Sequence, residues 1–466
     1  MSKIVAIVGA GPVGLAAAAH ALERGLDPVI LEAGEAPGHA VRQWSHVRMF
    51  SPWEYNIDKA AGRLLAEAGW NIPDPQSYPT GGELVSRYLE PLAARTALRN
   101  HVRTSSRVIA ISRLGFDKVK SKGREAAPFE IRYRNGKGPE RLVADAVIDA
   151  SGTWLSPNPA GDNGLPSFGE YELAEHVAYA MPDVLGRDRT RYAGKTVAVR
   201  GAGHSAIGTL IDLVKLKEAA PETTVIWLLR GTDPQKSFGG GANDKLSARG
   251  ELGAIFARLV GAGALQVETG FHLTHLGTSQ GRLRIGAGSA CCGRHVIADE
   301  LIVATGFRPD LAYLSELRLG LDPALDCPTA LAPLIDPNEH SCGTVRPHGA
   351  SELAHPEAGF YIAGMKSYGR APTFLMLTGY EQVRSIIADI AGDKEAAERV
   401  ELVLPETGVC SRSPVADAEG CCGGPAKEDA SACCAADEAA KAEGKPGCGS
   451  GPVLETQSSK VSACCG

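Results

Sequence analysis

The first thirty residues alternate between apolar runs and one glycine-rich break. A β-branched apolar run at 4–8 stops at a tight turn, and an alanine-rich segment of helical character follows it. A second apolar run at 28–31 ends in Glu32, 18 positions beyond the last glycine of the turn. The glycines of this turn are Gly9, Gly11 and Gly14. The pattern predicts a strand, a turn, a helix and a second strand.

The glycine spacing in this context is the GxGxxG fingerprint of dinucleotide binding. Gly9 permits the turn, Gly11 lets the backbone approach a pyrophosphate, and Gly14 lets the helix close on the strand. The helix N-terminus then offers free N–H groups and positive dipole to the phosphates. Glu32 is expected to accept hydrogen bonds from a ribose. The sequence therefore predicts a dinucleotide site here.

A second unit of the same kind lies further along the chain. A strand at 195–200 leads into a glycine turn, a helical run extends to Leu216, and a strand follows at 224–229. Alanine takes the third glycine position, which is an accepted variant. The expected nucleotide contacts are Gly201, Gly203, Ser205 and Arg230.

Arg230 stands where the first unit has its acid. An arginine at this position suits a ribose 2′-phosphate, which favours NADPH over NADH. Lys236 can assist. The alternative is an ordinary solvated arginine at a strand end.

Two similar strand exits bracket this second unit. The run 142–150 ends in Ser151-Gly152, and the run 301–304 ends in Thr305-Gly306. We therefore predict an α/β fold with two Rossmann-like, three-layer dinucleotide-binding domains, the second inserted in the first. The expected division is 1–155 and 301–395 for the first domain, 156–300 for the insert, and 396–466 for a tail.

Helix signals near the site and a change in composition complete this outline. Thr80 and Glu83 have capping-box spacing at the start of an amphipathic stretch that reaches Leu92. A run of helical period extends over 373–390. No aromatic residue follows Tyr380, and the cysteine-rich tail is too poor in apolar residues to bury a core, so we expect it to be disordered.

Composition narrows the possible partners. The 466 residues carry a formal net charge of −6, which argues against nucleic acid. No apolar run approaches the ~20 residues of a membrane span. The first strand begins at residue 3 and leaves no room for a signal peptide. We expect a cytoplasmic protein without a membrane contact.

Cysteine placement separates two branches of flavoproteins. The paired fingerprints resemble the flavoproteins with two dinucleotide-binding domains, which implies FAD in the first site and NADPH in the second. The reductases of this superfamily need a cysteine pair against the flavin, yet all 12 cysteines lie at or beyond Cys291. The vicinal Cys291-Cys292 also lacks CxxC spacing. These features disfavour a reductase.

The remaining motifs resemble the flavin monooxygenase branch, among them GAGHSA at 201–206 and the exit at 304–307. The signature of this branch between the domains is FxGxxxHxxxF/W. Its closest match here is Phe168-Gly169, but His176 follows three residues later than the signature requires. This departure argues against ketone or amine oxidation. The chain is most similar to the FAD/NADPH monooxygenases of bacterial arsenic-resistance operons. The similarity is carried by 42–53 (RQWSHVRMFSPW), 340–349 (HSCGTVRPHG), 359–375 (GFYIAGMKSYGRAPTFL) and CCGGPA at 421–426.

This resemblance implies an activity. NADPH would reduce FAD, and a flavin peroxide formed with O₂ would oxidise a trivalent arsenical, such as methylarsenite or arsenite, to its pentavalent form and confer arsenic resistance. By position, the candidates for lining the flavin are Trp44, Arg48, Ser51, Trp53 and Gly152. Gly364 and Met365, at the head of the last helix, should approach the ring, with the helix dipole aimed at it. The loop 42–57 is expected to lie over the ring or to pack as a surface loop.

Thiols are the expected ligands of soft trivalent arsenic. Cys342 is the candidate substrate ligand, and Cys327 is a second candidate beside it. The alternative is a buried, inert cysteine. The tail carries three vicinal pairs, which either capture arsenic or do nothing. They are Cys421-Cys422, Cys433-Cys434 and Cys464-Cys465.

Two other functions stay open. A metal-ion or disulfide reductase is one, because Cys464-Cys465 near the terminus is similar to the capture pair of mercuric reductases. A thiol-based arsenic-sequestering flavoprotein is the other.

Overall fold

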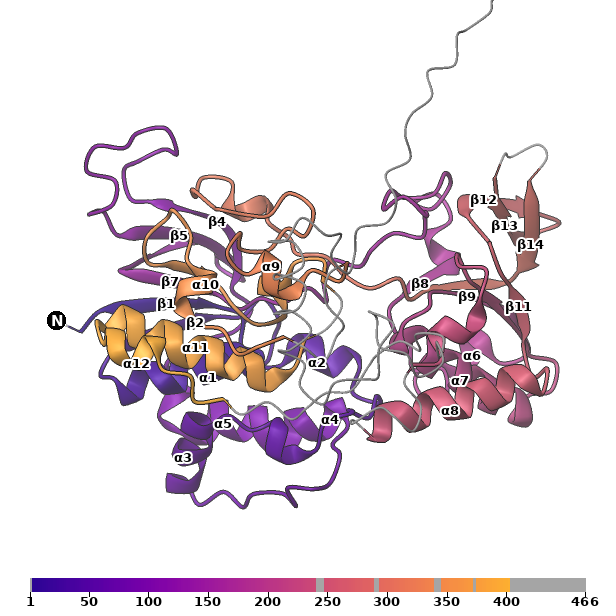
Figure 1. Cartoon of the computed structure of the whole chain (residues 1–466), viewed down its shortest axis with the longest axis horizontal. Coiled ribbons are helices and arrows are strands. Elements are labelled where there is room, and N and C mark those ends of the chain that lie inside the picture. The colour runs from indigo at the N-terminus through magenta and orange to yellow at the C-terminus, as the bar shows by residue number, and fades with distance from the viewer. Residues whose placement is uncertain (1, 240–246, 289–292, 339–344, 372–373, 403–466) are drawn as a thin grey trace, which may run out of the picture. The chain divides into compact units, whose positions relative to one another are not determined.

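The computed structural model describes residues 2–239, 247–288, 293–338, 345–371 and 374–402. They belong to one compact unit that spans residues 1–411. Two parallel β-sheets organise them, each built around one of the two glycine turns (Figure 1). We call the first sheet with its covering layers the first module, and the second sheet with its layers the second module.

The sheet of the first module has five parallel strands in the order β16-β7-β1-β2-β3. β1, which precedes the first glycine turn, lies at its centre. The strands are β1 (Ile4–Val8), β2 (Asp27–Leu31), β3 (Val102–Arg103), β7 (Ala146–Asp149) and β16 (Phe360–Ile362).

Side chains of β1 alternate between two covering layers. Val5 and Ile7 belong to a cluster with the helices, whereas Ala6 and Val8 belong to a cluster with an antiparallel sheet. Both clusters are buried, so the module has three layers. The helices are α1 (Pro12–Glu23), α3 (Lys59–Glu67), α5 (Glu90–Arg95) and α11 (Met376–Ala391), and the antiparallel strands are β4 (Arg107–Arg113), β5 (Phe129–Asn135) and β6 (Gly138–Ala144).

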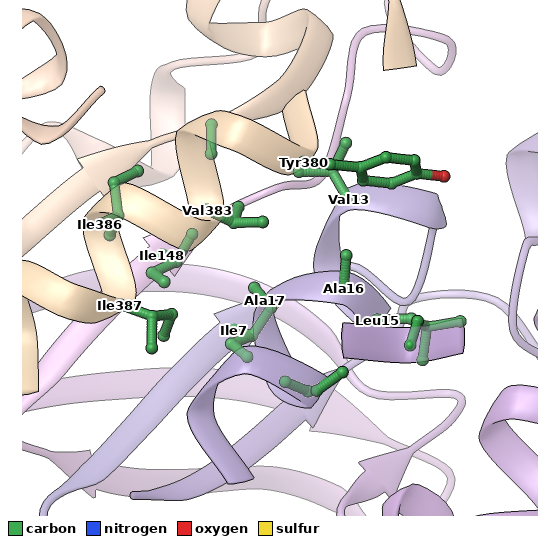
Figure 2. Close-up of a cluster of buried hydrophobic side chains, with 14 of the residues drawn as sticks. Ile7, Val13, Leu15, Ala16, Ala17, Ile148, Tyr380, Val383, Ile386 and Ile387 are labelled. Carbon is green, nitrogen blue, oxygen red and sulfur yellow. The ribbon is translucent and has the colours of Figure 1, made fainter. Parts of the chain in front are cut away.

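The C-terminal helix α11 closes the helical layer over α1. Figure 2 shows Val383, Ile386 and Ile387 of α11 gathered with side chains of α1 and of the central strands. A side chain at Gly379 of α11 would come within 2.7 Å of a methyl carbon of Val13. The missing side chain therefore lets α11 lie close to the start of α1.

The second module repeats this plan. Its parallel sheet has the order β11-β10-β9-β15-β8. Helices α7 (His204–Ala219) and α8 (Ser247–Gly261) cover one face, and a three-stranded antiparallel sheet covers the other. The strands are β8 (Val177–Tyr179), β9 (Thr196–Arg200), β10 (Thr224–Leu228), β11 (Gln266–Glu268) and β15 (Glu300–Val303), with β12 (Leu273–Ser279), β13 (Arg282–Ala287) and β14 (Arg294–Ala298) in the cover. The predicted α/β fold with two Rossmann-like units is confirmed.

The local helix signals also hold. The Thr80 side chain accepts from the Glu83 N–H while the Glu83 carboxylate accepts from the Thr80 N–H, which is the predicted capping box. The helix that it starts continues through a π-helical segment to Arg95. The run predicted over 373–390 is α11, whose described residues begin at Met376.

Two expected boundaries shift. β15 pairs with β9 in the second module, so the expected division after residue 300 separates residues 301–303 from the sheet to which they belong. Helix α12 (Lys394–Glu398) buries Ala396 and Ala397 against α11, so the packed chain extends beyond the expected tail start at 396. The other domain limits stay predictions, and residues 403–466 lie outside those described.

Shorter helices connect the layers. They are α2 (His39–Gln43), η1 (Trp53–Tyr55), α4 (Gly81–Leu84), η2 (Val85–Leu89), η3 (Ala97–Asn100), η4 (Ala174–His176), α6 (Arg189–Tyr192), η5 (Pro234–Ser237), η7 (Ala312–Leu314), α9 (Ala332–Ile335), α10 (Ala350–Leu353) and η8 (Gly364–Tyr368).

Among the described residues, no helix is long and apolar enough to cross a membrane.

A buried ionic triad joins the antiparallel cover to the chain before β16. The Glu357 carboxylate accepts from Arg113 at 2.8 Å and from Arg124 at 2.8 Å, and all three side chains are buried. Burial alone would raise the pKa of Glu357, but the hydrogen bonds from both arginines outweigh it and lower this pKa. The carboxylate therefore contributes stability above its ordinary pKa, and that stability is lost as pH falls through the lowered value.

Replacing Glu357 by alanine should destabilise the protein by about 3–5 kcal/mol near pH 7, because two buried guanidinium groups lose their counter-charge. Urea denaturation of wild type and variant measures the difference. Glu23→Ala is the matched control, since Glu23 pairs with Arg63 at the surface and its loss should cost no more than about 1 kcal/mol. Equal losses in the two variants would contradict the assignment.

Candidate functional site

The first glycine turn is held by direct contact of backbone on backbone. Gly9 has φ +99°, and a side chain there would stand 2.9 Å from the Ala150 carbonyl oxygen. A side chain at Gly14 would stand 2.0 Å from the Gly9 carbonyl oxygen. A side chain at Gly11 would meet nothing within 4 Å. Two glycines thus permit packing, and the third opens the N-terminus of α1 to a ligand.

Glu32 fixes the rim of this turn. Its carboxylate accepts from the Ala10 N–H and from the Gly34 N–H, both at 2.7 Å, and the residue is 8% exposed. Each carboxylate oxygen keeps further acceptor capacity. Glu32 can therefore tie two loops together and still accept from a ribose hydroxyl.

A cavity of about 510 Å³ extends from this turn. Its size lies within the range of cofactor sites, ~300–1,000 Å³. Gly9, Gly11 and Glu32 line it, and so do five tryptophan, tyrosine or phenylalanine rings and two methionines. These are Trp44, Trp154, Phe307, Tyr313, Phe374, Met365 and Met376.

Three of the aromatic rings form one connected wall. Trp154 stacks on Phe307 with ring centroids 4.8 Å apart, and Trp44 lies 6.3 Å from Trp154. The Trp154 indole N–H donates to the Gln43 side-chain oxygen at 2.8 Å. A wall of aromatic rings offers flat apolar surface on which a large planar ligand can pack.

Several predicted site residues come together at this cavity. Besides the three residues at the turn, they are Trp44, Gly152, Gly364 and Met365. Gly14 supports the turn from behind. Met365 lies in η8 and α11 starts at Met376, so the expected helix head near Met365 is placed about three turns too early. The cavity is lined from both segments.

Three predicted flavin-lining residues lie elsewhere. Trp53 is 1% exposed in the core, because η1 turns its ring inward, where the Arg87 guanidinium lies 5.6 Å from it. The Ser51 hydroxyl donates to the Asn56 side chain. The exposed Arg48 donates to the Tyr78 carbonyl. Among the described residues, none of these three lines the cavity, and Trp154 and Phe307 take the place expected for Trp53.

Thr305 and Gly306 hold two chain segments together. The Thr305 hydroxyl donates to the Asn158 carbonyl at 3.1 Å, and the Asn158 N–H donates to the Gly306 carbonyl at 2.9 Å. These residues join the segment that enters the second module to the segment that leaves it. Their neighbour Phe307 is the residue that reaches the cavity.

The second glycine turn has the same construction as the first. A side chain at Gly201 would stand 2.3 Å from the Ala304 carbonyl oxygen, whereas one at Gly203 would meet nothing within 4 Å. Helix α7 starts at His204, so Ser205 lies in its first turn. This helix N-terminus is open to a phosphate in the same way.

An ionic cluster lies beside this second turn. Arg200 is 4% exposed and bonds the Asp162 carboxylate, which also bonds His272. Burial lowers the pKa of Arg200 to about 10, and nearby Arg230 adds to the effect. Arg230 is exposed and donates to the Asp162 carbonyl at 3.3 Å. Lys236 is exposed in η5.

Sequence reasoning missed a polar network behind the first cavity. Asp149, at the end of β7, pairs with Lys366 in η8 at 2.8 Å, and both side chains are fully buried. Ser151 and Tyr313 bond this pair and line the cavity. The available signal was an aspartate at the end of an otherwise apolar strand.

The structure bears on one of the predicted thiols. Cys327 is fully buried, and burial together with Asp322 raises the pKa of its thiol to about 12. Cys327 is an inert core residue, and its thiol is not accessible as a second arsenic ligand. Cys342, Cys291, Cys292 and the cysteines of the tail lie outside the described residues. Within the part of the chain that the structure describes, no group of three or more His, Cys, Asp or Glu residues could hold a metal ion.

Two parallel sheets, each with a phosphate-binding glycine turn, define an oxidoreductase architecture for two dinucleotides. The chain belongs to the pyridine nucleotide-disulphide oxidoreductase family, which it matches over residues 6–326. FAD and NADPH are the cofactors that this family and its flavin relatives support, and the open turns, Glu32 and the aromatic cavity fit them.

Two curated relatives differ in what their names describe. The flavin-containing monooxygenase FMO GS-OX-like 2 of Arabidopsis thaliana is 23% identical over 239 residues, which cover 46% of this chain and 48% of the relative. The chain thus matches about half the length of this relative. Ferredoxin–NADP reductase of Rhodospirillum rubrum is 24% identical over 384 residues, covering 81% of this chain and 88% of the reductase.

A solved structure shows the same fold. Bacillithiol disulfide reductase Bdr from Bacillus cereus superposes with a TM-score of 0.62 at 19% identity, covering 84% of this chain and 99% of that chain.

Replacing Gly11 by valine should leave the apoprotein folded but weaken FAD binding by about a hundredfold, or ~2.7 kcal/mol, because the new side chain enters the cavity. Titration of apoprotein with FAD measures affinity, and thermal unfolding measures the fold. Gly14→Val is the comparison: its side chain meets the Gly9 carbonyl and should lower the unfolding temperature directly. Normal FAD affinity in the Gly11 variant would contradict the placement of the cofactor.

Proposed function

We propose that the chain is a cytoplasmic, NADPH-dependent flavin monooxygenase that oxidises trivalent arsenicals to their pentavalent forms. The observation that carries the oxygenase part is the lining of the first cavity. Among its described residues the lining contains aromatic rings and thioethers but no cysteine, and the sequence has no cysteine before Cys291. The described lining of the cavity therefore offers no dithiol that could take electrons from a flavin.

When bound, NADPH supplies a hydride and FAD carries the electron pair to O₂, so that one oxygen atom reaches the substrate and the other leaves as water. The protein holds the cofactors and excludes water. The Gly11 turn and the N-terminus of α1 would hold the FAD phosphates, and Arg230 would hold the 2′-phosphate of NADPH. The stacked Trp154 and Phe307 would shield the cavity from bulk water, which would favour oxygen transfer over release of peroxide.

The arsenical part rests on the sequence. Trivalent arsenic binds thiolates, and Cys342 lies in a motif similar to that of the arsenical monooxygenases. The vicinal cysteine pairs of the tail are suited to capture the same ion. A tail that captures substrate raises its concentration near the cavity.

Oxygen uptake tests the reaction class. Purified protein with NADPH should consume one O₂ per NADPH when methylarsenite is added, and the product should be pentavalent methylarsenate. NADPH oxidation that does not increase with arsenite, methylarsenite or a phenylarsenical would remove the substrate assignment. Oxidation of NADPH without oxygen consumption would remove the monooxygenase assignment as well.

A second candidate is electron transfer from NADPH to a protein acceptor. The reductase from R. rubrum favours it, because that relative aligns over most of both chains. Rapid NADPH-dependent reduction of ferredoxin under nitrogen, without a stimulation by arsenicals in air, would support this candidate. Reduction of a disulfide or a metal ion, or arsenic binding without turnover, would support the two remaining alternatives.

Replacing Cys342 by serine should raise the KM for the arsenical at least about tenfold, because the soft ligand is lost, and leave basal NADPH oxidation unchanged. Steady-state kinetics with methylarsenite measure both. Cys327→Ala is the matched control, since that thiol is buried in the core and should not affect KM. Unchanged arsenical kinetics in the Cys342 variant would contradict a role of this thiol in substrate binding.

Removing the tail tests substrate capture separately. Truncation after Leu402 keeps α12 and the contact of Glu401 with Arg384, which a cut after Ala391 would remove. A higher KM for arsenicals in the truncated protein would support capture. An unchanged KM and unchanged resistance in cells would mark the tail as an appendage.

Replacing Arg230 by alanine should raise the KM for NADPH by about 10–100-fold, because a charged hydrogen bond to phosphate contributes ~1.5–3 kcal/mol. The KM for NADH should change little, since NADH lacks the 2′-phosphate. Flavin reduction followed by stopped flow with each nucleotide gives the comparison. Equal effects on NADPH and NADH would contradict a phosphate contact.

A further inference from the structure

The buried pair of Asp149 and Lys366 lies at the centre of the first module. Asp149 ends β7 and is in register with Val8 of β1 on one side and Ile362 of β16 on the other. Val8 directly precedes the glycine turn. An ion pair at such a depth is costly unless each partner is fully hydrogen-bonded. Its partners therefore indicate what the pair does.

Two hydroxyl groups stand between this pair and the cavity. The Tyr313 hydroxyl donates to Asp149 Oδ2 at 2.6 Å, and the Ser151 hydroxyl donates to Asp149 Oδ1 at 2.7 Å. Lys366 Nζ donates to the Tyr313 oxygen at 2.7 Å and to the Ser151 oxygen at 3.2 Å. Ser151 and Tyr313 line the cavity, whereas Asp149 and Lys366 are buried behind them.

Counting hydrogens defines the chemistry of this surface. The ammonium group of Lys366 has three N–H donors, and Asp149, Ser151 and Tyr313 take all three. The two hydroxyl oxygens lie 3.1 Å apart, and each hydroxyl donates its one hydrogen to Asp149. Each hydroxyl oxygen also keeps a lone pair beyond the one that accepts from Lys366. With both hydrogens directed to Asp149, the two hydroxyls can serve a ligand in the cavity as acceptors only.

Oxygens that can only accept hydrogen bonds favour a ligand group that donates one, and they disfavour a phosphate, whose oxygens also only accept. Ser151 stands beside the phosphate-binding turn, because a side chain at Gly9 would lie 3.0 Å from the Ser151 α-carbon. In a dinucleotide, the groups that adjoin the phosphates are the two sugar chains, and their hydroxyls are donors.

We propose that Ser151 and Tyr313 form an acceptor pair that binds a sugar hydroxyl of FAD, either on its ribose or on its ribityl chain. Asp149 and Lys366 are positioning residues that hold the two hydroxyl hydrogens away from the cavity. This site goes beyond the proposed function, since it depends on FAD in the first site and not on whether electrons pass to O₂ or to a protein.

The test is FAD affinity. Tyr313→Phe keeps the ring and removes only the hydroxyl, and it should raise the Kd for FAD about fivefold, as expected for one hydrogen bond. Titration of the apoprotein, followed by flavin fluorescence, gives Kd without any turnover. Tyr361→Phe is the matched control, because Tyr361 also donates to an aspartate, Asp389 at 2.6 Å, but does not line the cavity.

FAD analogues identify the hydroxyl. The first analogue lacks the ribose 2′-hydroxyl, and each of the others lacks one ribityl hydroxyl. The analogue that lacks the bound hydroxyl should bind the wild-type protein about fivefold more weakly than FAD does. The same analogue and FAD should bind the Tyr313→Phe variant equally well. If each analogue loses the same factor in both proteins, or if Tyr313→Phe binds FAD like wild type, the proposal is overturned. Ser151→Ala replaces Tyr313→Phe in this comparison if the latter does not fold.

Lys366→Met separates positioning from simple stability. If Lys366 orients the hydroxyls, the folded variant should no longer distinguish FAD from the analogue identified above. If the variant unfolds at a lower temperature but distinguishes the two ligands as wild type does, Lys366 has a structural role only, and its part of the proposal is overturned.

Discussion

The first module depends on one contact between two stretches of backbone, that of Gly14 with the Gly9 carbonyl. Any side chain at position 14 would overlap that oxygen. The contact draws the first turn of α1 against the end of β1, and it directs the free N–H groups of the helix into the cavity. The same closeness places Gly9 against Ala150, so the chain directly after β7 lines the cavity while Asp149 stays buried behind it. Cofactor binding and packing are thus two results of one contact.

The second module shares the packing of its first glycine but has Ala206 where the first module has Gly14. Gly201 lies against the Ala304 carbonyl as Gly9 lies against that of Ala150. The charges around the two turns differ, however. Glu32 is held by two backbone N–H groups at the first turn, whereas Arg200 and Arg230 gather at the second. One backbone design therefore carries a carboxylate at the first turn and guanidinium groups at the second.

Local signals in the sequence predicted the parts of the site that local geometry determines. The glycine turns and the capping box at Thr80 act over a few residues, and the structure has both as expected. Glu32 lies at the first turn, where it accepts from two backbone N–H groups, and its contact with a ribose stays a prediction. Trp53 was misplaced because its inward turn depends on the short helix η1 and on packing with Arg87. The pair of Asp149 and Lys366 joins positions 217 residues apart, and only the sheet brings them together. Nothing in the sequence near either residue carries that information.

The bonds between Asn158, Thr305 and Gly306 have a consequence for how the two modules are joined. They bring the two ends of the second module side by side, with Pro157 bridged to Phe307. Because these ends meet, the second module leaves the first and returns to it at nearly the same point, and it needs no space within the first module. Phe307, which stacks on Trp154 at the cavity, follows directly after this junction. The residue that joins the two modules therefore also completes the aromatic wall of the cavity.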